Sequence, residues 1–178
     1  EGDYVQMGWG DRLDILRWSA LAHEMFGDTL QVYHGESMGA AAVMMASGES
    51  TPDYVRGFIE DCGYSTAWDE MAYCASKYLK RDSMLVSKAE KIIMERYGMS
   101  IHGVSSLRQL EKCRKPMLFI HGGADELVPV EMAYRNFEAK SNGYRELWIA
   151  PGSAHSRSYP DYPAEYTARV RKFLETLE

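Results

Sequence analysis

The sequence has little of what marks several large classes of protein. Only 3 of its 178 residues are cysteine, and Cys62, Cys74 and Cys113 form neither a CxxC pair nor a Cys/His cluster. This disfavours a structural zinc site and, because the count is odd, a disulfide framework. The longest apolar run, residues 38–46, is too short to cross a bilayer. The net charge of -6 gives no electrostatic reason to expect nucleic acid as a partner.

Internal repeats, low-complexity stretches and flexible linkers are absent from the sequence as well. Hydrophobic residues make up 46% and charged residues 26%, which is ordinary for a globular protein. We therefore expect one domain over residues 1–178. The chain begins with EGDYVQMGWGD rather than with methionine or a signal-like segment, and this start resembles the middle of a loop.

Strand-like and helix-like segments alternate along the chain. Strands are expected at residues 29–34, 55–62, 116–122 and 145–150, and helices at 11–26, 38–47, 129–141 and 163–178, with a polar and aromatic helical region over 66–97. Asp11 is a candidate N-cap for the first helix. The alternation predicts an α/β fold, a parallel sheet with helices on both faces. Functional residues should then follow the carboxyl ends of the strands.

The stretch HGESMGA, residues 34–40, places Ser37 between Gly35 and Gly39 where the first strand meets the second helix. This is the context of the G-x-S-x-G turn, which holds a serine in a strained backbone conformation with its hydroxyl pointing outward. A side chain at either glycine should collide with the neighbouring strand or helix. A purely structural turn is the alternative, and a nucleophilic serine is the favoured interpretation.

A serine nucleophile needs a histidine base and a carboxylate that orients the histidine. Among the five histidines, His155 in the loop PGSAHS is favoured because it directly follows the strand RELWIA. Asp125 in HGGADELVP follows the strand PMLFI in the same way and is favoured as the acid. The competing histidines are His23, His34, His102 and His121, and the competing acids are Glu126 and Asp61. The alternatives without a catalytic role are a histidine in a surface loop and an aspartate that caps a turn.

The segments HGESMGAAAVM, LFIHGGADELVP and APGSAHS together resemble the α/β-hydrolase superfamily, over essentially the whole chain. The similarity is greatest to bacterial serine hydrolases of the esterase or serine-aminopeptidase type. It implies catalysis by Ser37, Asp125 and His155, an ester or peptide substrate, and no metal or organic cofactor. It also implies that the Met38 N–H forms half of an oxyanion hole. Acyl transfer to another nucleophile and a non-catalytic interaction module are the competing functions.

The same resemblance places a helical cap or lid at residues 63–114. Tyr64 and Trp68 there are candidates for contact with substrate, as are Tyr73 and Tyr78, although their helical spacing equally fits core packing. Members of the superfamily carry further strands before the serine, one of them followed by the loop with the second oxyanion N–H. The strand at 29–34 is therefore expected to have an open edge. Either a missing N-terminal half or, as the favoured alternative, a second copy of the chain should pair with it.

Overall fold

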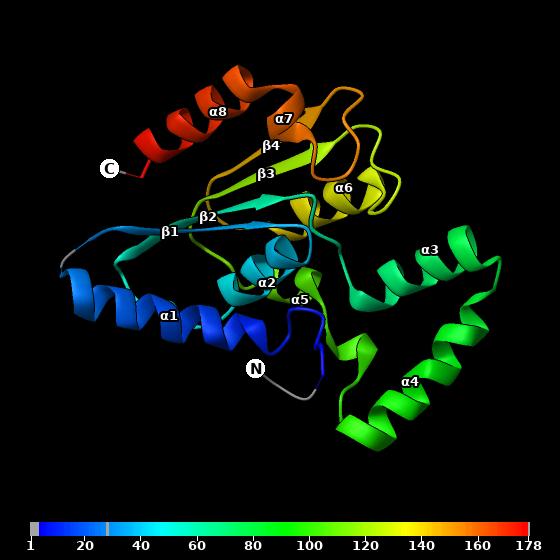
Figure 1. The fold of residues 1–178 in the computed structure, drawn as a ribbon. Coiled ribbons are helices and arrows are strands. Elements are labelled where there is room, and N and C mark those ends of the chain that lie inside the picture. Colours follow the sequence, from blue (N-terminus) through cyan, green and yellow to red (C-terminus); the bar gives the residue numbers. More distant parts are fainter. Residues whose placement is uncertain (1–3, 28, 178) are drawn as a thin grey trace.

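The computed structural model describes residues 4–27 and 29–177, which form a parallel sheet between two layers of helices (Figure 1). The four strands lie side by side in chain order, and each is parallel to its neighbour. They are β1 (Gln31–Glu36), β2 (Val55–Asp61), β3 (Met117–Gly122) and β4 (Arg145–Ala150). The predicted α/β class is confirmed. Because the strands are parallel, their carboxyl ends meet at one edge of the sheet.

Four helices cover one face of the sheet, namely α1 (Asp11–Phe26), α2 (Met38–Ser47), α5 (Ser106–Leu110) and α6 (Val130–Ala139). Residues 40–47 of α2 are all buried, which explains why this helix consists of small and apolar side chains. Tyr33, Phe58 and Phe119 of the sheet pack against Met44 of α2 in the core on this face. The helix that starts immediately after Ser37 is thus held rigidly against the sheet.

The opposite face is covered by α7 (Ser158–Asp161) and α8 (Pro163–Glu175). Ile59, Ile120 and Trp148 of the sheet pack there against Phe173 and Leu177. Burial of such aromatic and branched side chains contributes about 1.5–3 kcal/mol each. The amphipathic C-terminal helix is therefore bound through the apolar side that the sequence predicts.

A helical hairpin projects beyond the edge where the strands end (Figure 1). It consists of α3 (Ala67–Leu79) and α4 (Ser83–Tyr97), followed by a short 3-10 helix, η1 (Ile101–Gly103). The side chains of Thr66 and Asp82 cap the two helices by accepting the N–H groups of Asp69 and Met84. The hairpin lies within the segment 63–114 expected as a cap, and its action as a lid stays a prediction.

The expectations for the start of β1 and the cap of α1 differ from the structure. Strand β1 begins at Gln31 rather than at residue 29, because the ladder with β2 starts at the Gln31–Val55 pair, and it continues to Glu36. Asp11 is the first helical residue of α1 rather than its cap; Gly10 occupies the cap position, with no side-chain hydrogen bond.

All three cysteines are free, and Cys74 is only partly buried. Among the described residues, no helix combines the length and hydropathy needed to cross a membrane.

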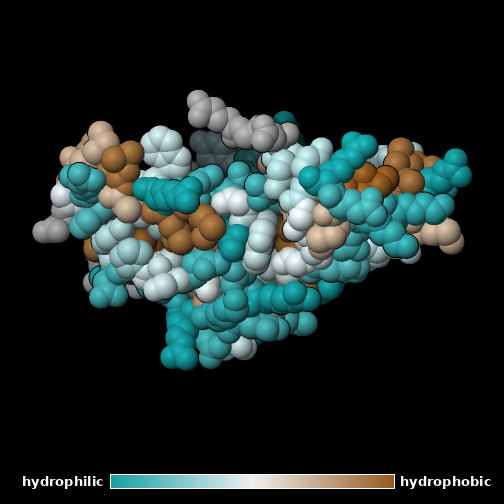
Figure 2. Space-filling model, turned by 90° about the horizontal axis from the view of Figure 1, so that it is seen from below, coloured by the Kyte–Doolittle hydropathy of each residue, from teal (hydrophilic) through white to brown (hydrophobic). Residues whose placement is uncertain are grey.

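Strand β1 lies at the edge of the described sheet, and the surface around it is apolar. On α1 the side chains of Trp18 and Phe26 are each 70% exposed, and Met25 is 66% exposed. Apolar surface gathers at this end of the molecule and again over the α3–α4 hairpin (Figure 2). Cavities of about 480 Å³ and 400 Å³ flank β1, and both include His34 and Gly35 in their lining. The free edge of β1 is therefore flanked by a cavity on each face of the sheet.

Candidate active site

Ser37 occupies the turn between β1 and α2 in a backbone conformation that L-residues rarely adopt, with φ 55° and ψ -121°. Its N–H donates to Asp61 O at 2.8 Å, and its carbonyl accepts the N–H of Ala41 at 3.1 Å. The first bond ties the turn to the end of β2, and the second starts the helix. Strain at a single polar residue, maintained by its surroundings, is typical of functional positions.

The two glycines around Ser37 have different roles. A Cβ at Gly35 would lie 2.3 Å from Gly39 O and 2.7 Å from Ala40 N, so only glycine lets β1 and the start of α2 approach this closely. A Cβ at Gly39 would meet nothing within 4 Å. The expectation that both positions exclude a side chain is therefore wrong for Gly39, whose missing side chain would point into the groove beside β1.

The loops after β3 and β4 bring Asp125 and His155 together. Ala124 N–H donates to Ser153 O at 2.9 Å, and Gly123 N–H donates to Ala150 O at 2.8 Å. Gly122 makes this contact possible, because a Cβ there would lie 2.4 Å from Ser153 O. The two loops thus form one unit above the ends of two adjacent strands.

Ser37, His155 and Asp125 form a continuous chain of hydrogen bonds. Ser37 Oγ lies 2.7 Å from His155 Nε2, and His155 Nδ1 lies 2.7 Å from Asp125 Oδ2. With the Nδ1 proton directed to the carboxylate, the Nε2 lone pair faces the serine hydroxyl. His155 and Ser37 are half-buried, whereas the Asp125 side chain is fully buried. The geometry lets the imidazole accept a proton from Oγ.

The Asp125 carboxylate is kept ionised by its neighbours. Its Oδ1 accepts the N–H groups of Leu127 and Val128, both at 2.9 Å. Burial alone would raise the pKa of Asp125, but the nearby His121 imidazole and the hydrogen bonds from His155 and Val128 outweigh burial and lower the pKa well below its usual range. A carboxylate that stays charged can orient a histidine and stabilise its cation.

Three buried polar residues lie close to this chain: His121 and Asp61, which were competing candidates in the sequence, and Glu60, which was not foreseen as a site residue. His121 lies behind Asp125, with Nε2 at 3.4 Å from Asp125 Oδ2, although the sequence favoured Asp125 over it as the functional group of that loop. Burial raises the pKa of Glu60 on β2 to about 8, with His121 and Gly63 opposing the shift. Burial also raises the pKa of Asp61 to about 6. The sequence signal for Glu60 and Asp61 was the pair of acids in VRGFIED, because carboxylates are rare in a buried strand.

The remaining candidate histidines have other partners. His34 Nε2 lies 2.9 Å from Tyr166 Oη, His102 stacks on Trp68 with ring centroids 4.0 Å apart, and His23 stacks on Tyr54 at the same distance. None of these three bonds to Ser37 among the described contacts.

Helix α3 is hydrogen-bonded to the loop that carries Asp125. The carbonyl of Glu126 accepts hydrogen bonds from Tyr73 Oη at 3.0 Å and from Lys77 Nζ and Tyr78 Oη at 2.8 Å. Lys77 also pairs with the Glu126 carboxylate at 3.2 Å. Glu126, a rival acid in the sequence, is 83% exposed at its side chain and anchors the hairpin instead.

Tyr64 and Trp68, the candidates for contact with substrate, pack in the second core cluster together with Ile101 and Met132. Tyr64 is 3% exposed, and its hydroxyl donates to Met7 O at 2.8 Å. Both side chains thus contribute to packing, and their contact with substrate stays a prediction. Met38 follows Ser37 as the first residue of α2, and its side chain is 41% exposed.

Among the described residues, Cys62, Asp125 and His155 come nearest to a metal-ligand set, with one ligand atom of each within 4.8 Å of the others. Asp125 Oδ2 and His155 Nδ1 are only 2.7 Å apart, joined by a hydrogen bond that a metal ion would have to break. Burial and the neighbouring Asp61 raise the pKa of the Cys62 thiol to about 12, so it stays protonated. The group fits a hydrogen-bonded site better than a metal centre.

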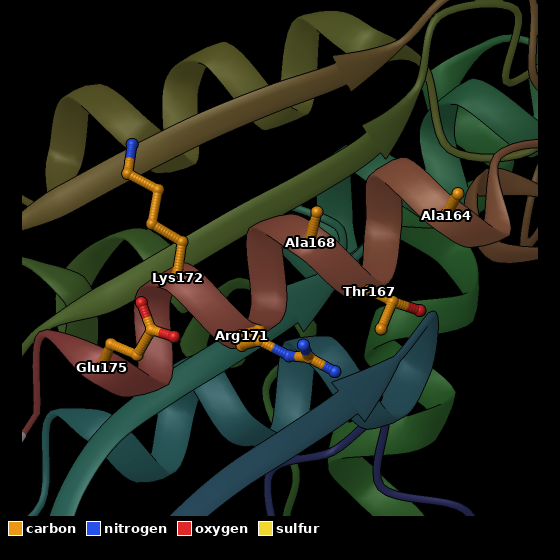
Figure 3. A pocket seen from close by; sticks show the side chains of 6 residues that line it. All are labelled: Ala164, Thr167, Ala168, Arg171, Lys172 and Glu175. Carbon is orange, nitrogen blue, oxygen red and sulfur yellow. The ribbon is translucent and has the colours of Figure 1, made fainter.

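A further cavity of about 410 Å³ lies along α8 and is lined by Ala164, Thr167, Ala168, Arg171, Lys172 and Glu175 (Figure 3). Its lining comes from a single helix, and its one hydroxyl, that of Thr167, is bonded to Pro163 O. It carries no part of the Ser37 chain, so its size alone does not assign it a role.

Comparison with known proteins identifies the family. The model of the prolyl oligopeptidase family matches residues 5–177, nearly the whole chain. The chain belongs to this family. An uncharacterised Bacillus subtilis protein, YqkD, is 32% identical over 145 residues, which cover 81% of this chain and 47% of that protein. The chain thus spans about half the length of this curated relative.

Solved structures of hydrolases share the fold. An esterase of Pyrococcus furiosus superposes with a TM-score of 0.75 at 23% identity, over 99% of this chain and 65% of the esterase. An acylaminoacyl peptidase of Pyrococcus horikoshii gives 0.69 at 19% identity, over 96% of this chain and 28% of that one. A monoacylglycerol lipase of Paleococcus ferrophilus gives 0.64 at 18%, over 94% and 76%. The α/β-hydrolase type of fold expected from the resemblance is confirmed.

Proposed function

We propose that the protein is a serine hydrolase that cleaves an ester or amide bond through an acyl-enzyme. Ser37 is the nucleophile, His155 the general base and Asp125 the acid that orients it. The observation that supports this most directly is the unbroken chain from Ser37 Oγ through His155 to Asp125, with both hydrogen bonds at 2.7 Å. The strained turn at Ser37 adds to it as a candidate nucleophile elbow.

The proposed reaction has two halves. As Ser37 Oγ bonds to the substrate carbonyl carbon, its proton passes to His155 Nε2, and Asp125 stabilises the imidazolium that forms. The carbon–oxygen or carbon–nitrogen bond then breaks, and the leaving alcohol or amine takes the proton from His155. Water attacks the acyl-enzyme with His155 again as the base, which releases the acid and restores the serine hydroxyl.

The developing oxyanion needs hydrogen-bond donors that are already in place. We assign one donor to the N–H of Met38, the first residue of α2, because it follows the nucleophile at a helix N-terminus. The N-terminal amides of α2 are held rigid, since the helix is buried from Ala40 onward.

The substrate class is proposed from the relatives together with the site. The structural neighbours are named an esterase, an acylaminoacyl peptidase and a lipase, which differ in substrate but act on acyl compounds. A serine–histidine–aspartate chain supplies the same acyl chemistry to esters and peptides. We therefore propose a carboxylic ester or acylated peptide as the substrate, with water as the acyl acceptor.

Labelling with a fluorophosphonate probe tests the nucleophile. The wild-type protein should react at Ser37, while the Ser37→Ala variant should not react and should lose turnover of a small ester by on the order of 10⁴-fold or more. Ser156→Ala is the matched control, because Ser156 adjoins His155 but its Oγ lies 3.7 Å from Cys62 Sγ. A wild-type protein that stays unlabelled would support the non-catalytic interaction module instead. Labelling that survives in Ser37→Ala would show that Ser37 is not the nucleophile.

Product analysis separates hydrolysis from acyl transfer. With an ester substrate and added alcohols or amines, the proposed hydrolase yields mainly the free acid. A product dominated by the new ester or amide would assign the protein to the acyltransferases.

A further inference from the structure

His121 stands at the end of β3, fully buried, directly beneath the loop that carries Asp125. Its Nε2 lies 2.9 Å from Val128 O and 3.4 Å from Asp125 Oδ2. Both neighbours are acceptors at neutral pH, so Nε2 carries a hydrogen. The shorter contact is the hydrogen bond to Val128, and the contact with Asp125 is mainly electrostatic.

We propose that His121 is a positioning residue for Asp125, fixing the acid loop through its hydrogen bond to the Val128 carbonyl. The inference rests on the proposed function, in which Asp125 serves His155. His121 acts only through the acid loop that its N–H donor holds in place.

The loop geometry supports the role of the His121 N–H donor. The Asp125 carboxylate accepts the N–H groups of Leu127 and Val128, which closes a tight turn. His121 then holds the carbonyl of Val128, where the turn ends and the path to α6 begins. Without this donor the Val128 carbonyl would be buried with no partner from His121, and a buried unpaired acceptor is costly. The turn is thus fixed at both ends, so Asp125 Oδ2 is held toward His155.

The burial of this contact adds to its importance. The His121 side chain is fully buried and Val128 is 2% exposed, so the Val128 carbonyl depends on the imidazole N–H rather than on bulk water.

Two substitutions test the donor. His121→Gln places an amide N–H near the position of Nε2, whereas His121→Phe has no donor there. We expect His121→Gln to keep kcat within about threefold of the wild-type value. His121→Phe should lose about 10- to 100-fold in kcat, with KM little changed, because the acid is misplaced in the transition state.

Phe119→Leu is the matched control for a purely structural effect, because Phe119 lies two residues earlier on the same strand and is equally buried. It should lower the stability while kcat stays within about threefold of the wild-type value. Equal losses of kcat in His121→Phe and Phe119→Leu, or a loss in His121→Gln as large as that in His121→Phe, would overturn the inference.

A second readout keeps the inference testable if the proposed function fails. Turnover that is unchanged in Ser37→Ala would refute the function, yet the proton NMR signal of His155 Nδ1–H, which faces Asp125 Oδ2 at 2.7 Å, would still report the position of the acid. A downfield signal that is kept in His121→Gln and Phe119→Leu but lost in His121→Phe supports the inference. A signal that is kept in His121→Phe overturns it.

Discussion

Replacement of Glu60 by glutamine should make the protein more stable at alkaline pH. Glu60 is 0% exposed, and its carboxyl accepts the Gly63 N–H at 2.9 Å. Burial raises the pKa of Glu60 from 4.5 to about 8, and the negative charge of Asp61 adds to the shift. Glutamine has nearly the shape of the protonated acid and can still accept from Gly63. The substitution therefore removes the ionisation while keeping the contact.

The sign follows from proton linkage. Between pH 4.5 and about 8 the folded protein keeps a proton on Glu60 that the unfolded chain releases, so the free energy of unfolding falls as pH rises. The fall is about 1.4 kcal/mol per pH unit, which gives at most roughly 5 kcal/mol across the interval. Glu60→Gln should thus match the wild type near pH 4.5 and exceed its stability by about 2–4 kcal/mol at pH 8.

Two neighbouring acids, Asp61 and Asp125, also make the stability depend on pH. Their contributions should be the same in the variant as in the wild type. The raised pKa of Asp61 lowers stability in the same way between pH 3.8 and about 6. The lowered pKa of Asp125 acts oppositely, because its contribution is present above pH 3.8 and is lost as pH falls toward its folded pKa. Comparison of variant with wild type isolates Glu60 from both.

Urea denaturation followed by circular dichroism at pH 5, 6, 7 and 8 measures the effect. Glu95→Gln on the exposed side of α4 is the matched control, since it makes the same substitution at an exposed carboxyl group. A stability difference between Glu60→Gln and wild type that stays constant from pH 5 to 8, or one that is equal in Glu95→Gln, would refute the reasoning.

Two further predictions concern the turn at Ser37 and the edge strand. Gly35→Ala should destabilise the fold by about 3 kcal/mol or more because its Cβ meets the backbone of Gly39, whereas Gly39→Ala should be neutral or stabilising by up to about 1 kcal/mol. Thermal denaturation of both variants is the check, and equal losses would contradict it. We also propose that a second copy of the chain pairs along β1, beside the exposed Trp18, so light scattering at low protein concentration should report a dimer. A stable monomer would rule this pairing out.

The backbone plan could be predicted from the sequence wherever patterns were local. The predicted limits of the helices 11–26 and 38–47 agree with α1 and α2 because glycines follow both segments, and the alternation of elements sufficed for the parallel sheet. Ser37, Asp125 and His155 could be singled out because each follows a strand, and parallel strands bring their ends together.

What escaped the sequence was long-range packing. The roles of Glu60 and His121 depend on burial between β2, β3 and the acid loop, which a strand-like run of residues does not reveal. The two glycines around Ser37 look equivalent in HGESMGA, yet only the close approach of β1 to α2 at Gly35 distinguishes them. Residues 29 and 30 are β-prone but have no ladder partner in β2, so propensity alone placed the strand start too early.

The three hydrogen bonds from α3 to the Glu126 carbonyl have a mechanical consequence. Tyr73, Lys77 and Tyr78 converge on one oxygen, so a displacement of the hairpin either breaks all three bonds together or pulls the neighbouring Asp125 with it. The hairpin and the acid loop are therefore mechanically coupled through the Glu126 carbonyl. Coupling of this kind is reciprocal: whatever fixes the hairpin steadies the carboxylate, and whatever steadies the carboxylate resists movement of the hairpin.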